Sequence, residues 1–304
     1  LLLAGALAIS ALAGCQSTPA SVSSGNSGGT TNSAISLQPE ATEAPAVATA
    51  ALVVETAEAT PTVQPSATAT SAVATVVEES PAQENSAAET AILLDGETIT
   101  VEGSGVQVND AAATITAAGV YNISGTLADG QIIVDTADED PVRLVLNGAS
   151  IHNATNAPLA VLNAAAVVIV LADGSENHLS DGESYSFADP AEDEPNAALF
   201  SKVDLTIEGQ GALSVEANYN DGIASKDGLV IRGGVINVSA LDDGIRGKDY
   251  LEIYDGAITV DSGGDGLKSD NEEDAALGYI AVESGAISVT AGGDAIQAQT
   301  HVLV

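Results

Sequence analysis

The sequence predicts an all-β domain built as a parallel β-helix, and three observations carry this prediction. From Ile92 onward the chain consists of short runs of alternating apolar residues broken by Gly, Asp and Asn, with no helical period. A phrase that opens with Asp, followed by Gly in three of its four copies, returns at positions 221, 243, 265 and 294. Each full copy carries three apolar doublets, each made of two residues that lie two positions apart, and this predicts three short strands per coil.

The spacing of the phrase sets the size of one coil, about 22 residues. The steps from 221 to 243 and from 243 to 265 are equal, and the step from 265 to 294 is longer, because the third copy contains an additional polar stretch around NEEDAAL, which marks an exposed turn. Both members of a doublet point inward, because side chains alternate between the two faces of a strand. The doublets of the first copy are Ile223 with Ser225, Leu229 with Ile231, and Ile236 with Val238. At this coil length the segment 92–304 predicts roughly ten coils.

A looser copy of the same doublets precedes the first clear one by about one coil, beginning at Leu199, Leu205 and Leu213. Farther upstream, VRLVLNGASI and AAVVIVLADG have strand and turn character, but the pattern does not assign their inward faces. Two other repeat folds are excluded because their repeat lengths differ from the one in this sequence. A left-handed β-helix returns every eighteen residues, and calcium-binding nonapeptide repeats return every nine.

Two segments precede the repeat domain. The first fifteen residues, LLLAGALAISALAGC, are apolar but too short to span a membrane, which predicts a secretory signal over 1–15. The end of this segment resembles the bacterial lipobox, so we expect Cys15, the only cysteine, to carry a lipid. Residues 16–91 are rich in Ala, Ser, Thr and Pro and are expected to form a disordered linker. These features predict an extracellular protein on a bacterial cell surface, held to the membrane by its lipid anchor alone.

Both ends of the sequence suggest incompleteness. No Met and no basic residue precede the apolar stretch, so we expect the signal to be incomplete at its N-terminus. The repeat domain, assigned to 92–304, stops at HVLV in mid-coil, so we expect it to be truncated at its C-terminus.

The charge of the chain is strongly negative. Lys and Arg number 7 against 43 Asp and Glu, which gives a formal net charge of -36. Such a chain offers no basic stripe that could release counterions from phosphates, which argues against nucleic acid or an anionic membrane surface as a partner. The same excess of acid creates a need for cations.

Stacking turns each repeated residue into a column. The aspartates that open the four copies form such a column: Asp221, Asp243, Asp265 and Asp294. Neighbouring carboxylates one strand spacing apart repel by roughly 0.9 kcal/mol at the dielectric constant of water, and by about 3.5 kcal/mol at an effective value of 20. The sequence offers two remedies, namely the lysines Lys226 and Lys248 or a bound metal ion.

Calcium is the metal that this pattern favours. Around Asp265 the acidic residues outnumber the nearby bases, which are Arg246, Lys248 and Lys268. Carboxylate oxygens in flexible turns are the ligands that Ca²⁺ prefers. The predicted ligands are Asp221, Asp242, Asp243, Asp265, Asp270 and Asp294. The alternative is that these aspartates are solvated turn residues, selected for turn geometry alone.

No other motif indicates catalysis. The histidines are isolated, and no serine-hydrolase, zinc-protease or phosphate-loop pattern occurs. Small residues occupy one inward column and are expected to pack or to form a serine ladder: Ser201, Ser225, Gly247, Ser269 and Ala298.

The phrases SKDGLVIRGG, LDDGIRGKDYLEI and GGDGLKSDNEED, with YNISGTLADGQIIV and VRLVLNGASI upstream, resemble the carbohydrate-binding β-helix lipoproteins of bacteria. That family is known from cellulose- and pectin-binding proteins of clostridia. The resemblance covers about 92–304 and implies a right-handed parallel β-helix related in shape to pectate lyases. It also implies bound calcium and a plant cell-wall polysaccharide, acidic or cellulosic, as the partner. Ala295 departs from the pattern, because it stands where the other turns have Gly.

Three functions are compatible with these observations. The first is non-catalytic, calcium-dependent binding of cellulose or polygalacturonate by a monomer, in which tyrosines could stack on sugar rings or serve as turn and cap residues. The second is a pectate-type lyase, in which Lys226 or Lys248 would abstract the C5 proton of a uronate. The interleaved Asp227 and Asp249 favour ion-paired lysines instead. The third is a surface adhesin or structural rod with a protein partner.

Overall fold

The computed structural model describes the backbone of residues 48–54 and residues 89–304 apart from 188 and 190. These residues form only strands and connecting turns, and none of them belongs to a helix that could cross a membrane. The strands are β1 (Ala48–Val54), β2 (Thr90–Gly96), β3 (Thr98–Glu102), β4 (Val106–Asn109), β5 (Ala112–Ile115), β6 (Gly119–Leu127), β7 (Gln131–Asp135), β8 (Val142–Asn153), β9 (Leu159–Asn163), β10 (Val167–Leu171), β11 (Glu176–Asp181), β12 (Ala197–Ser201), β13 (Leu205–Gly209), β14 (Ala212–Ala217), β15 (Asp221–Ser225), β16 (Gly228–Ala240), β17 (Ile245–Gly247), β18 (Tyr250–Ser262), β19 (Leu267–Ser269), β20 (Tyr279–Val282), β21 (Gly285–Ala291), β22 (Ile296–Ala298) and β23 (His301–Leu303).

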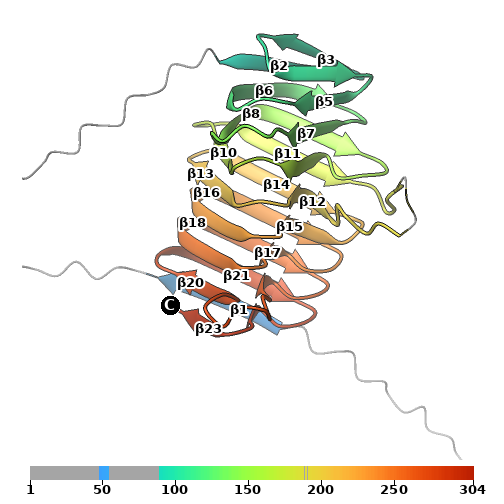
Figure 1. Cartoon of the computed structure of the whole chain (residues 1–304). Coiled ribbons are helices and arrows are strands. Elements are labelled where there is room, and N and C mark those ends of the chain that lie inside the picture. The colour runs from blue at the N-terminus through green and yellow to red at the C-terminus, as the bar shows by residue number, and fades with distance from the viewer. Residues whose placement is uncertain (1–47, 55–88, 188, 190) are drawn as a thin grey trace, which may run out of the picture. The chain divides into compact units, whose positions relative to one another are not determined.

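The strands wind into a parallel β-helix of about seven turns (Figure 1). One wall is a nine-stranded sheet in the order β22-β19-β17-β15-β12-β9-β7-β5-β4. The remaining walls belong to a fourteen-stranded sheet whose main path runs β1-β21-β18-β16-β13-β10-β8-β6-β2-β3. Strand pairs between successive turns are parallel, so the predicted fold class is confirmed.

The predicted inward columns form the core. In the nine-stranded sheet Ile223 pairs with Ile245, which is in line with Leu267 of the next turn. On the second wall Leu229 pairs with Leu251, and on the third Ile236 pairs with Ile258. The members of these columns are almost fully buried. Burial of such side chains contributes about 1.5–3 kcal/mol each, so the stacked aliphatic columns are the main source of stability.

Two of the three expected strands in a turn are joined into one bent strand. β16 and β18 are 13 residues long and contain both the second and third doublets of their turns. A register shift around Arg232 marks the corner, where Gly234 has φ +93°. Gly256 takes the corresponding place with φ +128°. These left-handed conformations favour glycine, so the corner bends without ending the hydrogen-bonded strand.

The number of turns is smaller than the roughly ten expected, because the upstream turns are longer. The step along the chain from Val167 to its partner Leu205 is much longer than the step from Leu229 to its partner Leu251. Most of the additional length lies between β11 and β12, in the insertion 182–196. The repeat is therefore less regular in the upstream sequence because the turns there differ in length.

The N-terminal part differs from the parallel stack. β2 and β3 form an antiparallel hairpin, as do β4 and β5. β1 pairs antiparallel with β21, and it lies within the segment 16–91 that the sequence predicts to be a disordered linker. β2 begins two residues before the expected domain boundary at 92. The predicted signal 1–15 and the lipidation site Cys15 lie outside the described residues.

Candidate functional site

Five of the seven basic residues of the chain lie on one wall. They belong to strands of the nine-stranded sheet or directly follow them, and we call them the cationic face: Lys202, Lys226, Arg246, Lys248 and Lys268. Alternation explains the placement of two of them. Ile245 and Leu267 point into the core, so Arg246 and Lys268 point outward. In a chain of net charge -36, this concentration of cations singles out the wall as the candidate site.

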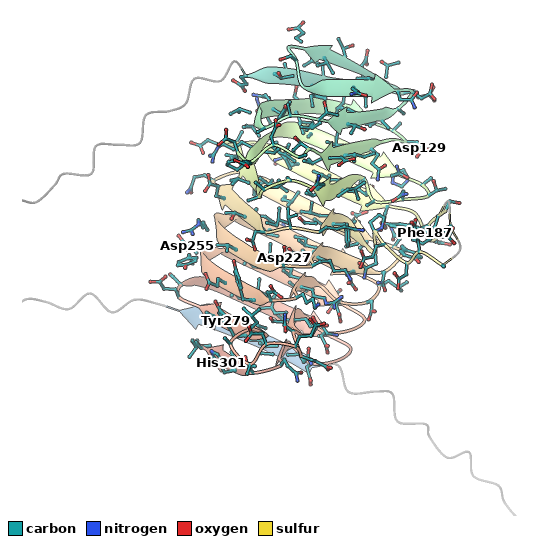
Figure 2. All side chains as sticks on the ribbon, in the orientation of Figure 1. Asp129, Phe187, Asp227, Asp255, Tyr279 and His301 are labelled. Carbon is teal, nitrogen blue, oxygen red and sulfur yellow. The ribbon has the colours of Figure 1, made fainter. Side chains whose placement is uncertain are left out.

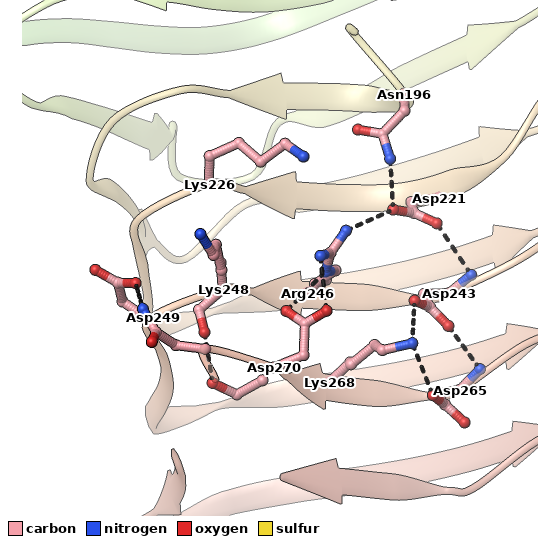
Figure 3. Close-up of polar contacts among 12 residues, drawn as sticks. Asn196, Asp221, Lys226, Asp243, Arg246, Lys248, Asp249, Asp265, Lys268 and Asp270 are labelled. Atoms are coloured by element: carbon pink, nitrogen blue, oxygen red, sulfur yellow. Dashed lines mark hydrogen bonds and ion pairs between the residues drawn. The ribbon is translucent and has the colours of Figure 1, made fainter. Parts of the chain in front are cut away.

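The predicted aspartate column lies beside the cationic face, and we call it the aspartate ladder: Asp221, Asp243, Asp265 and Asp294. The backbone N–H of Asp243 donates to Oδ1 of Asp221 at 3.3 Å. The N–H of Asp265 donates to Oδ1 of Asp243 at 2.9 Å (Figure 3). The N–H of Asp294 donates to Oδ1 of Asp265, also at 2.9 Å. Hydrogen bonds to charged acceptors are worth about 1.5–3 kcal/mol, so the ladder offsets part of its own repulsion.

Arg246 and Lys268 contact three of the four carboxylates of the ladder. Lys268 Nζ lies 2.9 Å from Oδ2 of Asp243 and 3.0 Å from Oδ2 of Asp265. Arg246 makes two hydrogen bonds to Asp270, at 3.1 and 2.7 Å, and its Nη1 lies 3.8 Å from Oδ2 of Asp221. Of the two remedies that the sequence offers, Lys226 and Lys248 do not contact the ladder. They follow their strands and pair with Glu194 and Glu273 instead.

The electrostatics of the ladder follow from burial. Asp221 is 2% exposed, and burial raises the pKa of its carboxyl to about 7, with a further increase from the negative charge of Asp243. Arg246 opposes this increase. Burial lowers the pKa of Lys268, but the two ladder carboxylates outweigh it, so that the pKa is raised. Lys268 is therefore a permanently charged member of the face.

A second set of ion pairs lies farther along the cationic face. Lys226 Nζ is 2.6 Å from Glu194, and Lys202 Nζ is 3.3 Å from the other oxygen of the same carboxylate. Lys248 lies 3.9 Å from the exposed Glu273. Both lysines suggested as lyase bases are thus in ion pairs, whereas a base must be an unprotonated amine.

The insertion 182–196 covers the neighbouring part of the same wall. Tyr185 packs on a small apolar cluster on the outer side of the sheet, made of Ala157, Ala160, Ala197, Phe200 and Ala224. The Tyr185 hydroxyl donates to Asp181 at 2.7 Å, and its ring stacks on Tyr219 with 4.1 Å between centroids. The insertion therefore covers the apolar part of the wall with Tyr185 and reaches the charged part with Glu194.

The six predicted calcium ligands do not form a cage as they stand. Both side-chain oxygens of Asp221, Asp243 and Asp265 already accept hydrogen bonds or contact a cation. Asp270 is bound by Arg246, and in the described part of the chain the carboxylates of Asp242 and Asp294 have no partner. No group of three or more His, Cys, Asp or Glu side chains gathers as metal ligands among the described residues. Calcium binding at these turns stays a prediction.

The small inward residues play a structural part. Ser201, Ser225 and Ser269 are almost fully buried, and each hydroxyl donates to a backbone carbonyl, that of Val203 for the first two and Lys248 for the third. These hydrogen bonds tie the turn after each short strand to the wall beneath it.

Three aromatic rings form a column near the C-terminal end of the helix, where Figure 2 labels two of them. Tyr250 stacks on Tyr279 at 5.6 Å, and Tyr279 stacks on His301 at 5.3 Å. Both faces of Tyr279 are therefore covered by other rings. The hydroxyl of Tyr279 donates to Glu252 at 2.7 Å. This arrangement supports the cap-like alternative for Tyr279 over sugar stacking, because both faces of its ring are already occupied.

The sequence analysis counted Arg246 and Lys268 among the bases near Asp265 but did not pair them with the aspartate ladder, and it missed Glu194. The alternation in DGIRG and DGLKS was a usable signal, because the residue after the inward Ile or Leu must point outward beside the ladder. Glu194 gave no such signal, since it comes from an insertion whose path the repeat does not define.

Comparisons with known proteins agree with this architecture. Residues 109–304 match the family described as carbohydrate-binding domain-containing protein. A carbohydrate-binding domain-containing protein of Acetivibrio thermocellus is 48% identical over 214 residues, which are 70% of this chain and 75% of the relative. The structure of a polysaccharide lyase-like protein from C. thermocellum, a gadolinium derivative, superposes with a TM-score of 0.67 at 34% identity and covers 71% of this chain and 96% of that one. The chain therefore belongs to the family of carbohydrate-binding domain-containing proteins.

Proposed function

We propose that the β-helix binds plant cell-wall polysaccharide, polygalacturonate or cellulose, without cleaving it, through the cationic face. The concentration of five of seven basic residues on one wall is the observation that carries the proposal. Ammonium and guanidinium groups recognise the carboxylates of a uronic acid polymer directly, and calcium bound at the acidic turns would add to this attraction.

The face also offers what a neutral glycan requires. Exposed carboxylates at the same turns, those of Asp242 and Asp294, accept hydrogen bonds from sugar hydroxyls, while Lys and Arg donate to them. Turns stacked at about 4.8 Å repeat these groups along the helix, which suits an extended polymer more than a small ligand. Cellulose therefore stands beside polygalacturonate as a candidate.

The proposal includes a location. A lipid on Cys15 followed by the segment 16–91 would display the domain on the outside of a bacterial cell, where such polymers are met.

Retention on immobilised polygalacturonate and on cellulose tests the proposal. The double variant Lys226→Gln/Lys248→Gln removes two charges from the cationic face, and Arg143→Gln/Arg232→Gln removes two from other walls as a matched control. The face variant is expected to bind polygalacturonate at least about tenfold more weakly, because each charged contact is worth about 1 kcal/mol or more. An equal loss in the control variant would contradict the assignment of the face.

Calcium dependence is tested in the same assay. The excess of acid around Asp265 is what supports it, and a chelator is then expected to reduce retention. Undiminished retention in excess chelator would contradict calcium bridging and would leave direct binding by the cationic face in place.

A further inference from the structure

One carboxylate on the cationic face comes from outside the wall. The partners of Arg246 and Lys268 belong to the repeat, at its turns. The partner of Lys202 and Lys226 is Glu194, which belongs to the insertion 182–196. One glutamate thus bridges two lysines of successive turns, with 3.3 Å to Lys202 and 2.6 Å to Lys226.

The insertion holds Glu194 in place by contacts on both sides of it. Pro195 is buried, and the Asn196 side-chain amide donates to Asp221 at 3.2 Å. Toward the N-terminal side, Tyr185 packs on the apolar cluster around Phe200. Glu194 itself keeps 29% of its side chain exposed, and Lys202 and Lys226 keep 45% and 28%. The three charged groups therefore remain accessible to a ligand in solution.

Glu194 contacts the two lysines in the way that the carboxylate of a bound ligand would. Each oxygen of Glu194 contacts one ammonium group, and these groups come from adjacent turns. A uronic acid residue of a polysaccharide carries the same group on an extended chain. Unlike Lys268, Lys202 and Lys226 make no ion pair with the aspartate ladder and pair with the insertion instead. A ligand could therefore bind these two lysines without disturbing the ladder.

We infer that Lys202 and Lys226 form a subsite for the carboxylate of a uronic acid residue, and that Glu194 occupies this subsite until a ligand displaces it. The inference rests on the proposed function and names the ligand class of one part of the face. Glu194 then sets the affinity for acidic polymer, because each bound uronate must compete with an intramolecular carboxylate.

The charge state of Glu194 agrees with this inference. Burial raises the pKa of its carboxyl, but the hydrogen bond and charge of Lys226, and then of Lys202, outweigh burial and lower it. Glu194 is therefore ionised under the conditions in which a uronate is ionised, so both carboxylates carry the charge that the two lysines bind.

A purely structural role for Glu194 predicts a different result. If the ion pairs only fasten the insertion, their loss would loosen it and would not raise affinity for an acidic ligand. Partly exposed ion pairs contribute little to folding, so the effect on binding and the effect on stability can be separated.

Isothermal titration of the full chain with oligogalacturonate is the test. Glu194→Gln keeps the size of the side chain and is expected to raise affinity about three- to tenfold, since releasing two exposed ion pairs lowers the cost of binding. Glu192→Gln is the matched control, because Glu192 is exposed, lies on the same insertion and makes no ion pair among the described residues. Adding Lys226→Gln to Glu194→Gln is expected to abolish the gain. A cello-oligosaccharide titrated in parallel should show no gain in either variant.

The outcomes separate the inference from the proposed function. Oligogalacturonate binding by the wild type with equal affinities for Glu194→Gln and Glu192→Gln would overturn the inference and leave the proposed function standing. Binding by neither the wild type nor Glu194→Gln would overturn both. If circular dichroism shows that Glu194→Gln unfolds, Glu194→Asp replaces it, because this variant keeps the charge. Its shorter side chain should compete less well for the two lysines and still raise the affinity for oligogalacturonate. An unchanged affinity would count against the subsite.

Discussion

Replacing Asp221 with Asn should remove a pH dependence from the stability of the domain. The Asp221 carboxyl has a pKa of about 7 in the fold, because it is buried and lies beside Asp243, whereas an aspartate in an unfolded chain has a pKa near 4. The folded state therefore holds a proton that the unfolded chain has lost. The stability that this proton contributes to the fold is fully present below about pH 4 and is lost as the pH rises through 7.

The size of the effect follows from the two pKa values. Between them, stability falls by about 1.4 kcal/mol for each pH unit, so from pH 5 to pH 8 the loss is roughly 2.7 kcal/mol. The asparagine of the Asp221→Asn variant would keep an oxygen to accept the N–H of Asp243 but carries no titrating group.

Urea-induced unfolding of the wild type and of Asp221→Asn at about pH 5 and pH 8 measures this effect. The difference in unfolding free energy between the two proteins should shift by roughly 2.7 kcal/mol in favour of the variant at the higher pH. Asp193→Asn, which removes an exposed carboxylate from the insertion, should show no such shift. A pH dependence that is equal in Asp221→Asn and the wild type would refute the argument from burial.

Three further outcomes follow from the same geometry. Lys268→Gln should lower the unfolding free energy by about 1–3 kcal/mol in thermal or urea unfolding, because it leaves Asp243 and Asp265 without their shared cation. The control Arg143→Gln removes an exposed ion pair and should cost less than about 1 kcal/mol. Gly244→Ala should cost about 2 kcal/mol or more by the same measurement, since a Cβ there would lie 2.3 Å from a Val260 methyl and 2.6 Å from a backbone carbonyl oxygen. Incubation with polygalacturonate and calcium should give no increase in the ultraviolet absorbance of unsaturated uronides, and such an increase would establish lyase activity instead.

The repeat made the core predictable from sequence. The doublets from Ile223 onward fall in the walls and columns expected, because the constant period of the phrase leaves one register that keeps every apolar pair inward. The bend that joins two doublets in β16 could not be seen, since Gly233 and Gly234 read equally well as a turn between separate strands. The upstream turns were harder, because the step from Val167 to Leu205 contains an insertion with no repeat of its own.

The charged site was predictable in its acidic half only. Asp221, Asp243 and Asp265 repeat at a fixed spacing, so their stacking followed from the period. The cations that hold them reach across turns, and reach depends on side-chain direction as well as on sequence distance. Glu194 lies beyond any such reasoning, because only the folded insertion brings it to Lys226.

The turns of this helix are not interchangeable modules, although their backbones are nearly equivalent. Arg246 contacts Asp221 on the preceding turn and Asp270 on the following one, so each turn is matched to both neighbours by charge. Deleting residues 243–264 would preserve the backbone register and the column of aspartates, and Lys268 would take the place of Arg246 beside Asp221. Asp270, however, would lose the guanidinium that makes two hydrogen bonds to it. Duplication or loss of a turn in this family should therefore be accompanied by compensating changes in the turns on either side, which gives an otherwise uniform rod a fixed order.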